Sequence, residues 1–421
     1  MMINLQAFSG EKMKISFIGL GKLGLPLACC LAASGRKILC VDKNEHVLDT
    51  LKRGQLPFFE PGLEDLLKKA DKNLIGFTDS YSKAIEETDV SLILVNTQLG
   101  DDGYASDFVE AALSDIAINL RDSDKPYHTI VLSSTVLPGT IKDKLIPLVE
   151  NISNRKYKEG FGFSYVPDFV RLGMVIEDFK NPEFFLIGSN CKKDYKITKK
   201  IFKDLHENKP PHYSLTLEEV EVAKVALNAF IVNKITFANF LGQLCDELEN
   251  VNVHNITETI GNDKRISPFF FSSGAPYGGT CFPRDTWAFI RFAKDRGKEA
   301  KNLIFAEEVN EMVYQDIFKK VSKYKKVGIL GVSFKPNSPV TIGSPSARLI
   351  KELKRDGKEV YTYDPIPEVY SNLRLDVNEC SSIEDCLEKS EVVAIMHYDE
   401  RYKKVSDSSS KIIDVWGNGR K

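Results

Sequence analysis

The feature that most constrains the fold is a short apolar run that leads directly into a glycine-rich turn. Residues 14–18 are strand-like, the turn at 19–24 reads Gly-Leu-Gly-Lys-Leu-Gly, and an apolar helical stretch follows to about Ser34. A second strand-like run, 37–41, ends at Asp42. A strand, a GxGxxG turn, a helix and a second strand that ends in an acidic residue are typical of doubly wound α/β domains that bind dinucleotides. We therefore predict such a domain at the start of the chain.

The residues of this turn suit a pyrophosphate. Gly19 permits the tight turn, Gly21 lets backbone N–H groups approach a phosphate, and Gly24 allows close packing of helix on sheet. The helix N-terminus adds partial positive charge. Asp42 can accept hydrogen bonds from a ribose diol and would repel a 2′-phosphate, which favours NAD over NADP. The alternative is a glycine-rich turn that binds something else.

The rest of the chain divides into further α/β segments and one long helix. Apolar runs separated by helical patterns predict a parallel, doubly wound sheet; they are residues 90–95, 129–132, 163–166 and 184–187. A helical pattern from about 215 to 249 would span roughly 50 Å.

A second strand, glycine turn, helix and strand follow this helix, without the glycine fingerprint. They lie at residues 327–330, Gly331, 346–355 and 359–363, the last ending at Asp364. Residues 403–411 are expected to be a loop before a last strand at 412–415. The predicted fold is two Rossmann-like doubly wound α/β domains joined by a long central helix, with domains at 14–205, 206–320 and 321–421.

A second informative segment places a cysteine before a helix. It reads Gly278-Gly279-Thr280-Cys281-Phe282-Pro283-Arg284-Asp285. Pro283 suits the first turn of a helix, so Cys281 would lie at the positive end, where a thiolate is favoured. A buried, small apolar role is the better prediction for Cys29, Cys30, Cys40 and Cys245.

Lys224 and Asn228 are four residues apart on the long helix and therefore share a face. A solvated stripe is the simpler interpretation of such a pair. Because most of their neighbours are apolar, that face is expected to be partly buried. A buried lysine is costly unless it is paired, which makes Lys224 a functional candidate.

Composition and motif searches exclude several classes of protein. The 57 Lys+Arg and 59 Asp+Glu give a net charge of -2, so neither nucleic acid nor an anionic membrane is an expected partner. No apolar stretch approaches the roughly 18 residues of a membrane span, and residues 1–14 do not resemble a signal peptide. Eight scattered cysteines without a CxxC favour a reduced, cytoplasmic protein. The histidine spacing predicts no metal site, and neither a Walker motif nor GxSxG occurs.

These segments resemble the UDP-glucose dehydrogenase family of nucleotide-sugar 6-dehydrogenases, from about residue 14 to the end. The resemblance rests on residues 19–24, Phe59-Glu60-Pro61-Gly62-Leu63, Ser133-Ser134-Thr135-Val136, Lys224 with Asn228, Tyr277 to Asp285, and Phe334-Lys335-Pro336. It implies a four-electron oxidation of a nucleotide-sugar C6 alcohol to a carboxylate with two NAD. Cys281 would capture the aldehyde as a thiohemiacetal and carry it as a thioester.

The resemblance also implies roles for individual residues. Lys224 would stabilise an oxyanion, Asp285 would help activate water or the thiol, and Thr135 and Asn228 would position water and oxygen atoms. Asp168 is the further catalytic candidate. The expected cofactor-binding residues are Gly19, Gly21, Lys22, Leu23, Gly24, Asp42, Thr97 and Thr135. The expected substrate-binding residues are Lys224, Asn228, Arg265 of a neighbouring subunit, Tyr277, Gly278, Gly279, Phe334 and Lys335. The C-terminal domain would bind UDP, and the central helices would form a homodimer.

Several positions depart from the family pattern. Asp168 stands where a glutamate is usual, and the second acidic position of that segment is Leu172. Ile342 replaces an arginine expected near the cofactor, and Ser272 replaces a common substrate-loop lysine. Pro276 replaces the first glycine of the usual Gly-Tyr-Gly-Gly segment, and Gln98, after Thr97, replaces a proline.

These departures leave the sugar open. UDP-glucose is the first expectation, and a UDP-N-acetylhexosamine, UDP-galactose or GDP-mannose is the alternative. A nucleotide-sugar-binding protein without turnover would explain the departures, but it leaves unexplained why Cys281, Lys224, Asn228 and Asp285 are all present. A two-electron hydroxyacid dehydrogenase would leave Cys281 and the second α/β domain unexplained.

Overall fold

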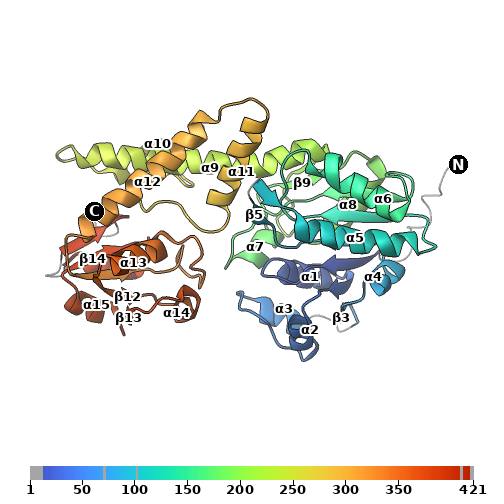
Figure 1. Cartoon of the computed structure of the whole chain (residues 1–421), viewed down its shortest axis with the longest axis horizontal. Helices are drawn as coiled ribbons and strands as arrows, with labels where there is room; N and C mark the ends of the chain where they lie inside the picture. Colours follow the sequence, from blue (N-terminus) through green and yellow to red (C-terminus); the bar gives the residue numbers. More distant parts are fainter. Residues whose placement is uncertain (1–12, 70–72, 101–102, 408–410, 418–421) are drawn as a thin grey trace. The chain divides into compact units, whose positions relative to one another are not determined.

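The computed structural model describes residues 13–69, 73–100, 103–407 and 411–417 (Figure 1). The chain forms two compact units, Met1–Val225 and Ala226–Lys421. The boundary between them falls within one long helix, α9 (Leu217–Asp246).

The first unit is built on an eight-stranded sheet in the order β10-β9-β8-β7-β4-β1-β2-β3. All neighbours pair in parallel except β8 and β9, which are antiparallel. The strands are β1 (Lys14–Ile18), β2 (Lys37–Val41), β3 (Ile75–Thr78), β4 (Val90–Ile93), β7 (His128–Leu132), β8 (Phe161–Tyr165), β9 (Phe185–Gly188) and β10 (His212–Leu215). A separate hairpin joins β5 (Gln98–Gly100) to β6 (Gly103–Ala105).

Helices cover this sheet in two groups. Contacts join α1 to α3 and α7, and α5 to α4 and α6, and each group has its own apolar core. The helices are α1 (Gly24–Ala33), α2 (Glu45–Lys52), α3 (Leu63–Lys69), α4 (Tyr81–Glu87), α5 (Asp107–Arg121), η2 (Ile141–Leu145), α6 (Ile146–Ser153), α7 (Val175–Lys180) and α8 (Lys192–Phe202). The apolar strands at the centre follow from this double cover, because parallel strands are buried on both faces.

The second unit combines helices with a smaller parallel sheet in the order β13-β12-β11-β14-β15. Its strands are β11 (Lys326–Leu330), β12 (Glu359–Tyr363), β13 (Asn378–Glu379), β14 (Val392–Ile395) and β15 (Lys411–Asp414). Besides its part of α9, its helices are α10 (Val253–Gly261), α11 (Phe282–Asp295), α12 (Lys301–Val321), α13 (Pro345–Arg355), α14 (Glu368–Leu373), α15 (Ile383–Lys389) and η3 (Glu400–Asp407).

The predicted fold class is confirmed: two doubly wound α/β sheets are present, and the long helix lies between them in the chain. One prediction was wrong in part, because residues 400–407 form a 3-10 helix where a loop was expected from 403 to 411. Tyr402 and Val405 of this helix are buried against the C-terminal sheet, which gives this polar sequence its local structure. Residues 408–410 lie outside the described part of the chain.

Contrary to the expectation from the sequence, one helix, α9, is long and apolar enough to cross a membrane when judged by length and composition alone. The same test is passed by core helices of proteins that never enter a membrane. Leu217, Val220 and Val232 of α9 lie in apolar clusters with neighbouring segments, and Glu221 and Lys224 are buried on it with polar partners. These contacts are those of a core helix.

A buried polar chain crosses three central strands of the first unit. Ser16 Oγ on β1 and Ser91 Oγ on β4 lie 2.8 Å apart, and Ser91 Oγ lies 2.8 Å from Nε2 of His128 on β7. All three residues are fully buried. Burial lowers the pKa of His128 to about 3, so this imidazole is neutral in the folded protein at neutral pH.

Candidate active site

The glycine turn after β1 has the geometry of a dinucleotide-binding turn. Gly19 has φ +97°, and a Cβ there would lie 2.4 Å from the carbonyl oxygen of Leu94. A Cβ at Gly24 would lie 2.0 Å from the carbonyl oxygen of Gly19. Gly21 differs, because a Cβ there would have no atom within 4 Å. Gly19 and Gly24 are therefore needed by the fold itself, whereas Gly21 leaves open space where a phosphate can approach the backbone.

Asp42 lies beside this turn at the end of β2. Its Oδ2 accepts the N–H of Leu20 at 2.7 Å, and its Oδ1 accepts the N–H of Asn44 at 2.9 Å. Lys22 is exposed and Leu23 is half-buried against the core. β1 lies between β2 and β4, where the strand order reverses and doubly wound sheets bind their ligands. The open face at Gly21 and the carboxylate of Asp42 thus fit a dinucleotide.

Three more predicted residues follow neighbouring strands at the same edge of the sheet. Thr97 follows β4, Thr135 follows β7 and Asp168 follows β8. Because these strands are parallel, their carboxyl ends share one edge. Thr97 and Thr135 are buried. The side chain of Asp168 is 13% exposed.

Lys224 is buried and held by the segment that carries Asp168. Its Nζ donates to the backbone carbonyl of Asp168 and lies 3.8 Å from Asp168 Oδ1, with the two side chains 7% and 13% exposed. The Phe169 ring centroid lies 4.8 Å from Nζ. The predicted partial burial of this face of α9 is confirmed, and the buried ammonium has the carboxylate partner that such a charge needs.

Two buried glutamates that the motif analysis left without a role hold the loops after β7 and β8. Glu221 accepts the N–H groups of Gly139 at 2.8 Å and Ile141 at 2.9 Å. Glu60 accepts those of Gly173 at 3.1 Å and Val175 at 2.9 Å. Burial raises the pKa of Glu221 to about 7, against the lowering effect of its two N–H partners.

A signal for Glu221 was present in the sequence. Residues 221, 224 and 228 follow the i, i+3, i+7 spacing of one helix face. An acidic residue in an otherwise apolar helix stretch requires a partner when that face is buried.

In the second unit, Cys281 immediately precedes α11, as predicted. It occupies the N-cap position, its carbonyl accepts the N–H of Asp285 at 2.8 Å, and Pro283 lies in the first turn. The residue is exposed, and its Sγ lies 3.6 Å from Thr280 Oγ1. Cys29, Cys30, Cys40 and Cys245 are buried, as expected. An accessible sulfur at a helix N-terminus can act as a nucleophile.

Asp285, four residues later, is fully buried, and both oxygens of its carboxylate accept hydrogen bonds. Its Oδ2 accepts from Asn228 Nδ2 at 2.6 Å, and its Oδ1 accepts from Arg284 Nε at 2.9 Å. This carboxylate is therefore held by an amide from α9 and a guanidinium from its own helix. Arg284 is a further residue that the sequence analysis did not single out.

The glycines before Cys281 pack against the loop after β11. A Cβ at Gly278 would lie 2.2 Å from the carbonyl oxygen of Gly343, and one at Gly279 would lie 2.7 Å from the Phe334 ring. Gly279 has φ +81°, and its N–H donates to Gly343 at 2.9 Å. The close approach made by these glycines is therefore to the chain itself.

Tyr277 is buried and anchors the same loop. Its hydroxyl donates to Glu307, and its N–H donates to Asn310 Oδ1 at 2.8 Å. Burial and the Glu307 carboxylate raise the pKa of this phenol above its usual range. The structure thus gives Tyr277 a role in placing the cysteine loop.

The second sheet repeats the turn of the first. Gly331 N–H donates to the Tyr363 carbonyl at 2.9 Å, as Gly19 N–H donates to Val41 at 2.9 Å. Asp364 Oδ2 accepts the N–H of Val332 at 2.8 Å, as Asp42 accepts that of Leu20.

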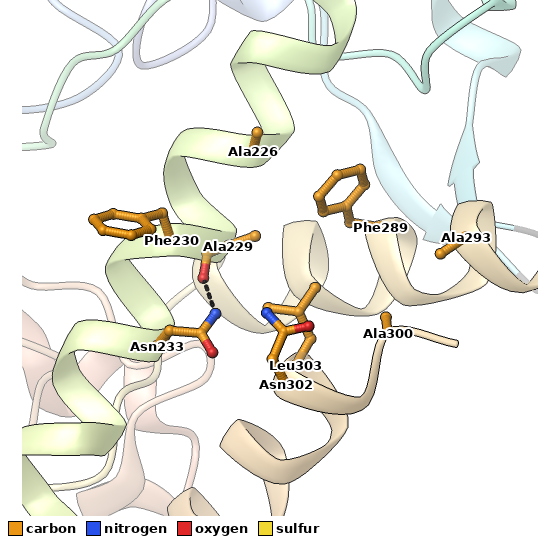
Figure 2. Close-up of a pocket in the computed structure, with 9 residues that line it drawn as sticks. All are labelled: Ala226, Ala229, Phe230, Asn233, Phe289, Ala293, Ala300, Asn302 and Leu303. Carbon is orange, nitrogen blue, oxygen red and sulfur yellow. Dashed lines mark hydrogen bonds between the residues drawn. The ribbon is translucent and has the colours of Figure 1, made fainter. Parts of the chain in front are cut away.

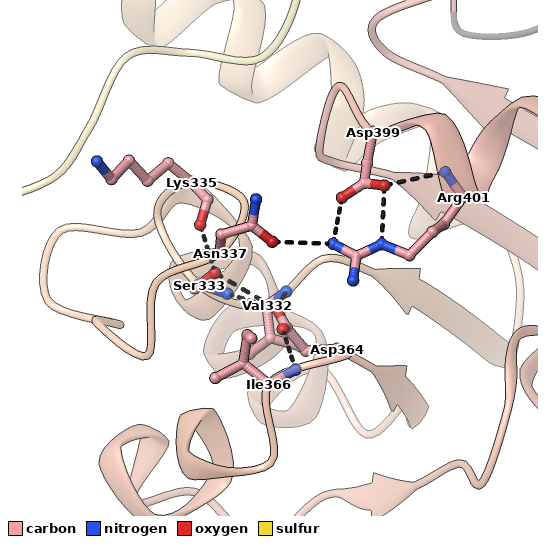
Figure 3. A network of polar contacts seen from close by, with 8 residues as sticks. All are labelled: Val332, Ser333, Lys335, Asn337, Asp364, Ile366, Asp399 and Arg401. Carbon is pink, nitrogen blue, oxygen red and sulfur yellow. Dashed lines mark hydrogen bonds and ion pairs between the residues drawn. The ribbon is translucent and has the colours of Figure 1, made fainter. Parts of the chain in front are cut away.

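Figure 3 shows this second turn with its surrounding network. Asp364 also accepts the N–H groups of Ser333 and Ile366, and Arg401 pairs with Asp399 and contacts Asn337. The side chain of Lys335 points away from these carboxylates in the figure, and its Nζ lies 5.6 Å from the centroid of the Phe334 ring. Both Phe334 and Lys335 are half-buried.

The remaining predicted and departing positions lie mostly at the surface. Arg265 has an 86% exposed side chain that pairs with Asp263 at 2.6 Å. Ile342 is exposed, and Ser272 is exposed with its hydroxyl 3.3 Å from His254 Nδ1. Leu172 is half-buried against the first core, and Pro276 is buried. Among the described residues, no group of three His, Cys, Asp or Glu side chains could hold a metal ion.

A cavity of about 240 Å³ in the second unit contains none of the predicted site residues (Figure 2). Its lining is apolar apart from two asparagines, and it consists of Ala226, Ala229, Phe230, Asn233, Phe289, Ala293, Ala300, Asn302 and Leu303. It offers no titratable group for catalysis.

Comparison with known proteins gives matches along nearly the whole chain. Models of the UDP-glucose/GDP-mannose dehydrogenase family match as an NAD binding domain at residues 13–206, a central domain at 218–312 and a UDP binding domain at 328–417. A UDP-glucose 6-dehydrogenase of Rhizobium meliloti is 34% identical over 367 residues, covering 84% of this chain and 82% of that protein.

Two further relatives are similar over more of the chain. A GDP-mannose 6-dehydrogenase of Pseudomonas syringae is 30% identical over 433 residues, covering 96% of each chain. The solved UDP-glucose dehydrogenase of the archaeon Pyrobaculum islandicum superposes with a TM-score of 0.90 at 28% identity, covering 98% of this chain and 96% of that one.

Proposed function

The chain belongs to the UDP-glucose/GDP-mannose dehydrogenase family, and we propose that it oxidises the C6 hydroxyl of a UDP-hexose to a carboxylate. UDP-glucose, which would give UDP-glucuronate, is the first candidate substrate. The chain is a nucleotide-sugar dehydrogenase with an NAD binding domain. The observation that carries the four-electron reaction is the exposed Cys281 thiol at the start of α11, four residues before the buried carboxylate of Asp285.

The proposed reaction has four stages, of which the last three involve a covalent bond to Cys281. The C6 alcohol loses a hydride and its hydroxyl proton to become an aldehyde. Cys281 adds to the aldehyde carbon as a thiolate, and the oxygen takes up a proton to give a thiohemiacetal. Loss of that proton and a second hydride leaves a thioester. Water then attacks, the carbon–sulfur bond breaks, and the carboxylate leaves while the sulfur recovers its thiolate. NAD, when bound, supplies the hydride acceptor, so two are used per sugar.

The side chains suit the charges that develop in these stages. The Lys224 ammonium would stabilise the oxyanion, since a buried cation acts strongly on a neighbouring negative charge. Asp285, held by Asn228 and Arg284, would accept a proton from water or the thiol. Thr135 and Asp168 would position water at the edge of the sheet, and Asn228 would orient an oxygen of the substrate.

The cofactor and the sugar nucleotide would use the two repeated turns. Gly19, Gly21, Lys22, Leu23, Gly24, Asp42, Thr97 and Thr135 would hold NAD. Phe334, Lys335 and the loop of Tyr277, Gly278 and Gly279 would hold the UDP-sugar, with Lys224, Asn228 and Arg265 of a neighbouring subunit. Lys335 supports this assignment, because it follows the second turn and offers an ammonium for phosphate.

A different sugar nucleotide is the second candidate. GDP-mannose 6-dehydrogenases are 29–30% identical to this chain over 433 residues, close to the 34% of the Rhizobium meliloti UDP-glucose enzyme over 367. The exposed Ser272 replaces a substrate-loop lysine of the family pattern, and the exposed Ile342 replaces an arginine expected near the cofactor, so contacts with the substrate and with the cofactor would both differ from that pattern.

We further propose that the enzyme is a cytoplasmic homodimer joined through its central helices. Large apolar side chains are exposed on α9, α11 and α12; they include Phe230, Phe237, Trp287, Phe305 and Met312. Apolar surface of this extent favours association. Light scattering at micromolar concentration would measure the mass, and a monomer at all concentrations would refute the dimer.

The experiment that tests the function is NADH yield per sugar consumed. UDP-glucose, UDP-galactose, UDP-GlcNAc, UDP-ManNAc and GDP-mannose would each be supplied with excess NAD. Two NADH per sugar with one substrate is expected, together with failure of Cys281→Ala to complete the second oxidation. One NADH per sugar, unaffected by Cys281→Ala, would refute the thioester mechanism. NADH from none of the sugars would refute the activity.

A further inference from the structure

Glu221 is a fully buried carboxylate that binds the end of a loop rather than another side chain. It accepts the Gly139 and Ile141 N–H groups with one oxygen each, at 2.8 and 2.9 Å. These groups lie where η2 begins. The first N–H groups of a helix have no partners within it, and a carboxylate is favoured at that end. Glu221 thus fastens the start of η2 to α9.

The loop that Glu221 holds, residues 133–140, carries Thr135 and is fastened at its other end as well. Ser134 Oγ donates to the carbonyl of Val95 and accepts its N–H, both at 2.8 Å. Thr135 therefore lies between two polar anchors, one on the segment after β4 and one on α9. Its buried side chain depends on both anchors for its place.

The same helix carries Lys224 one turn after Glu221. Lys224 is in turn bonded to the segment after β8 through Asp168. The two successive residues on this face of α9 therefore fasten the two loops that carry Thr135 and Asp168. A change in the first anchor alters the position of Thr135 relative to Lys224.

We propose that Glu221 is a positioning residue: by accepting the N–H groups of Gly139 and Ile141, it fixes the 133–140 loop along α9 and thereby sets the spacing of Thr135 and Lys224. This inference rests on the proposed function, because the spacing is significant only if both side chains act on the substrate. Glu221 itself touches no reacting atom in this scheme.

The test compares Glu221→Gln with Glu219→Gln on the same helix. Glutamine keeps the size of Glu221 but has one acceptor oxygen for two N–H groups. Glu219 is exposed and accepts the N–H of Thr216 at 2.7 Å, a bond that glutamine can keep. We expect kcat to fall about ten- to a hundredfold in Glu221→Gln alone, since misplacement by about 1 Å has effects of that size. Amide exchange across 136–145 should accelerate in Glu221→Gln and not in Glu219→Gln.

A double-mutant cycle with Thr135→Val separates positioning from general destabilisation. If Glu221 acts through Thr135, Glu221→Gln should lower the kcat of Thr135→Val by less than about threefold. Fully additive losses would overturn the inference, as would an unchanged kcat in the single variant. Glu221→Asp, which keeps the charge on a shorter side chain, takes the place of Glu221→Gln in the cycle if the glutamine variant does not fold.

The amide exchange comparison needs no turnover. A wild-type protein that oxidises no nucleotide sugar would refute the proposed function, whereas equal exchange in Glu221→Gln and Glu219→Gln would overturn the anchor itself. The two failures are therefore distinguishable.

Discussion

Acidification should destabilise the first unit through His128, the imidazole buried between Ser91 and the core. Its pKa is about 3 in the folded protein because burial disfavours the charged form, against about 6.5 in an unfolded chain. Between these values the unfolded chain binds more protons than the folded one. The contribution to stability is therefore fully present above about pH 6.5 and is lost as the pH falls towards 3.

The size of the effect follows from these two values. Between pH 7 and pH 5 the unfolded imidazole becomes almost fully protonated while the folded one stays neutral, which removes about 2 kcal/mol from the free energy of unfolding. His128→Gln removes the titrating group and retains an amide that can bond to Ser91. Between pH 7 and pH 5, the free energy of unfolding of the variant should therefore fall by about 2 kcal/mol less than that of the wild type.

The assay must report on the first unit. Both tryptophans, Trp287 and Trp416, lie in the second unit, so intrinsic tryptophan fluorescence would follow the wrong part of the chain. Amide exchange of β1, β4 and β7, corrected for the intrinsic rate at each pH, gives the opening free energy of the right strands. His46→Gln, at an exposed histidine on α2, is the matched control. An equal fall in opening free energy between pH 7 and pH 5 in the wild type and in His128→Gln would refute the reasoning.

Four further substitutions test the turns and the cysteine loop. Gly21→Ala should keep the thermal midpoint of the wild type, because its Cβ meets no atom within 4 Å, but it should weaken NADH binding about tenfold or more. Gly24→Ala should lower the midpoint by several degrees, since its Cβ lies 2.0 Å from a carbonyl oxygen. A lower midpoint in Gly21→Ala than in Gly24→Ala would contradict the assigned roles. Asp42→Asn should weaken NAD binding by about 1.5–3 kcal/mol. It should also reduce the preference for NAD over NADP, measured as the ratio of the two Kd values. Gly278→Ala, with its Cβ 2.2 Å from a backbone oxygen, should slow alkylation or turnover at Cys281 while NADH binding is retained; unchanged reactivity would show that the loop tolerates the shift.

Local patterns in the sequence were sufficient to predict most of the central strands and the start of α11 at Cys281, but not the buried central strand β14. The bounds of β1, β2 and β12 were predicted to the residue, because β1 ends at the glycine turn and β2 and β12 end at Asp42 and Asp364. Cys281 at the start of α11 followed from Pro283 and the preceding glycines. Among the edge strands, β15 was predicted at 412–415, whereas β3, β10 and β13 were missed. β13 has two exposed residues, and such a segment takes its structure from pairing rather than from an apolar pattern.

What the sequence did not predict depends on contacts between distant residues. Glu221 and Glu60 bind backbone N–H groups 80 and 113 positions away, and no local spacing specifies such a partner. Gly278 and Gly279 pack closely against Gly343 and Phe334, a contact between segments about 60 residues apart that the local sequence does not indicate. The three-domain division at 14–205, 206–320 and 321–421 stays a prediction, as do the roles of the individual site residues.

The contact between the cysteine loop and the loop after β11 limits how this protein can be divided or recombined. Gly278 and Gly279 fit against Gly343 and Phe334 with no room for a side chain on either glycine. A chimera that takes its C-terminal sheet from a relative must therefore also take the surface that fits these glycines, or the position of Cys281 will change. A truncation before β11 would likewise remove the support of Cys281. The C-terminal sheet is in this sense part of the scaffold of Cys281, so exchanging that sheet should also change the reactivity of this thiol.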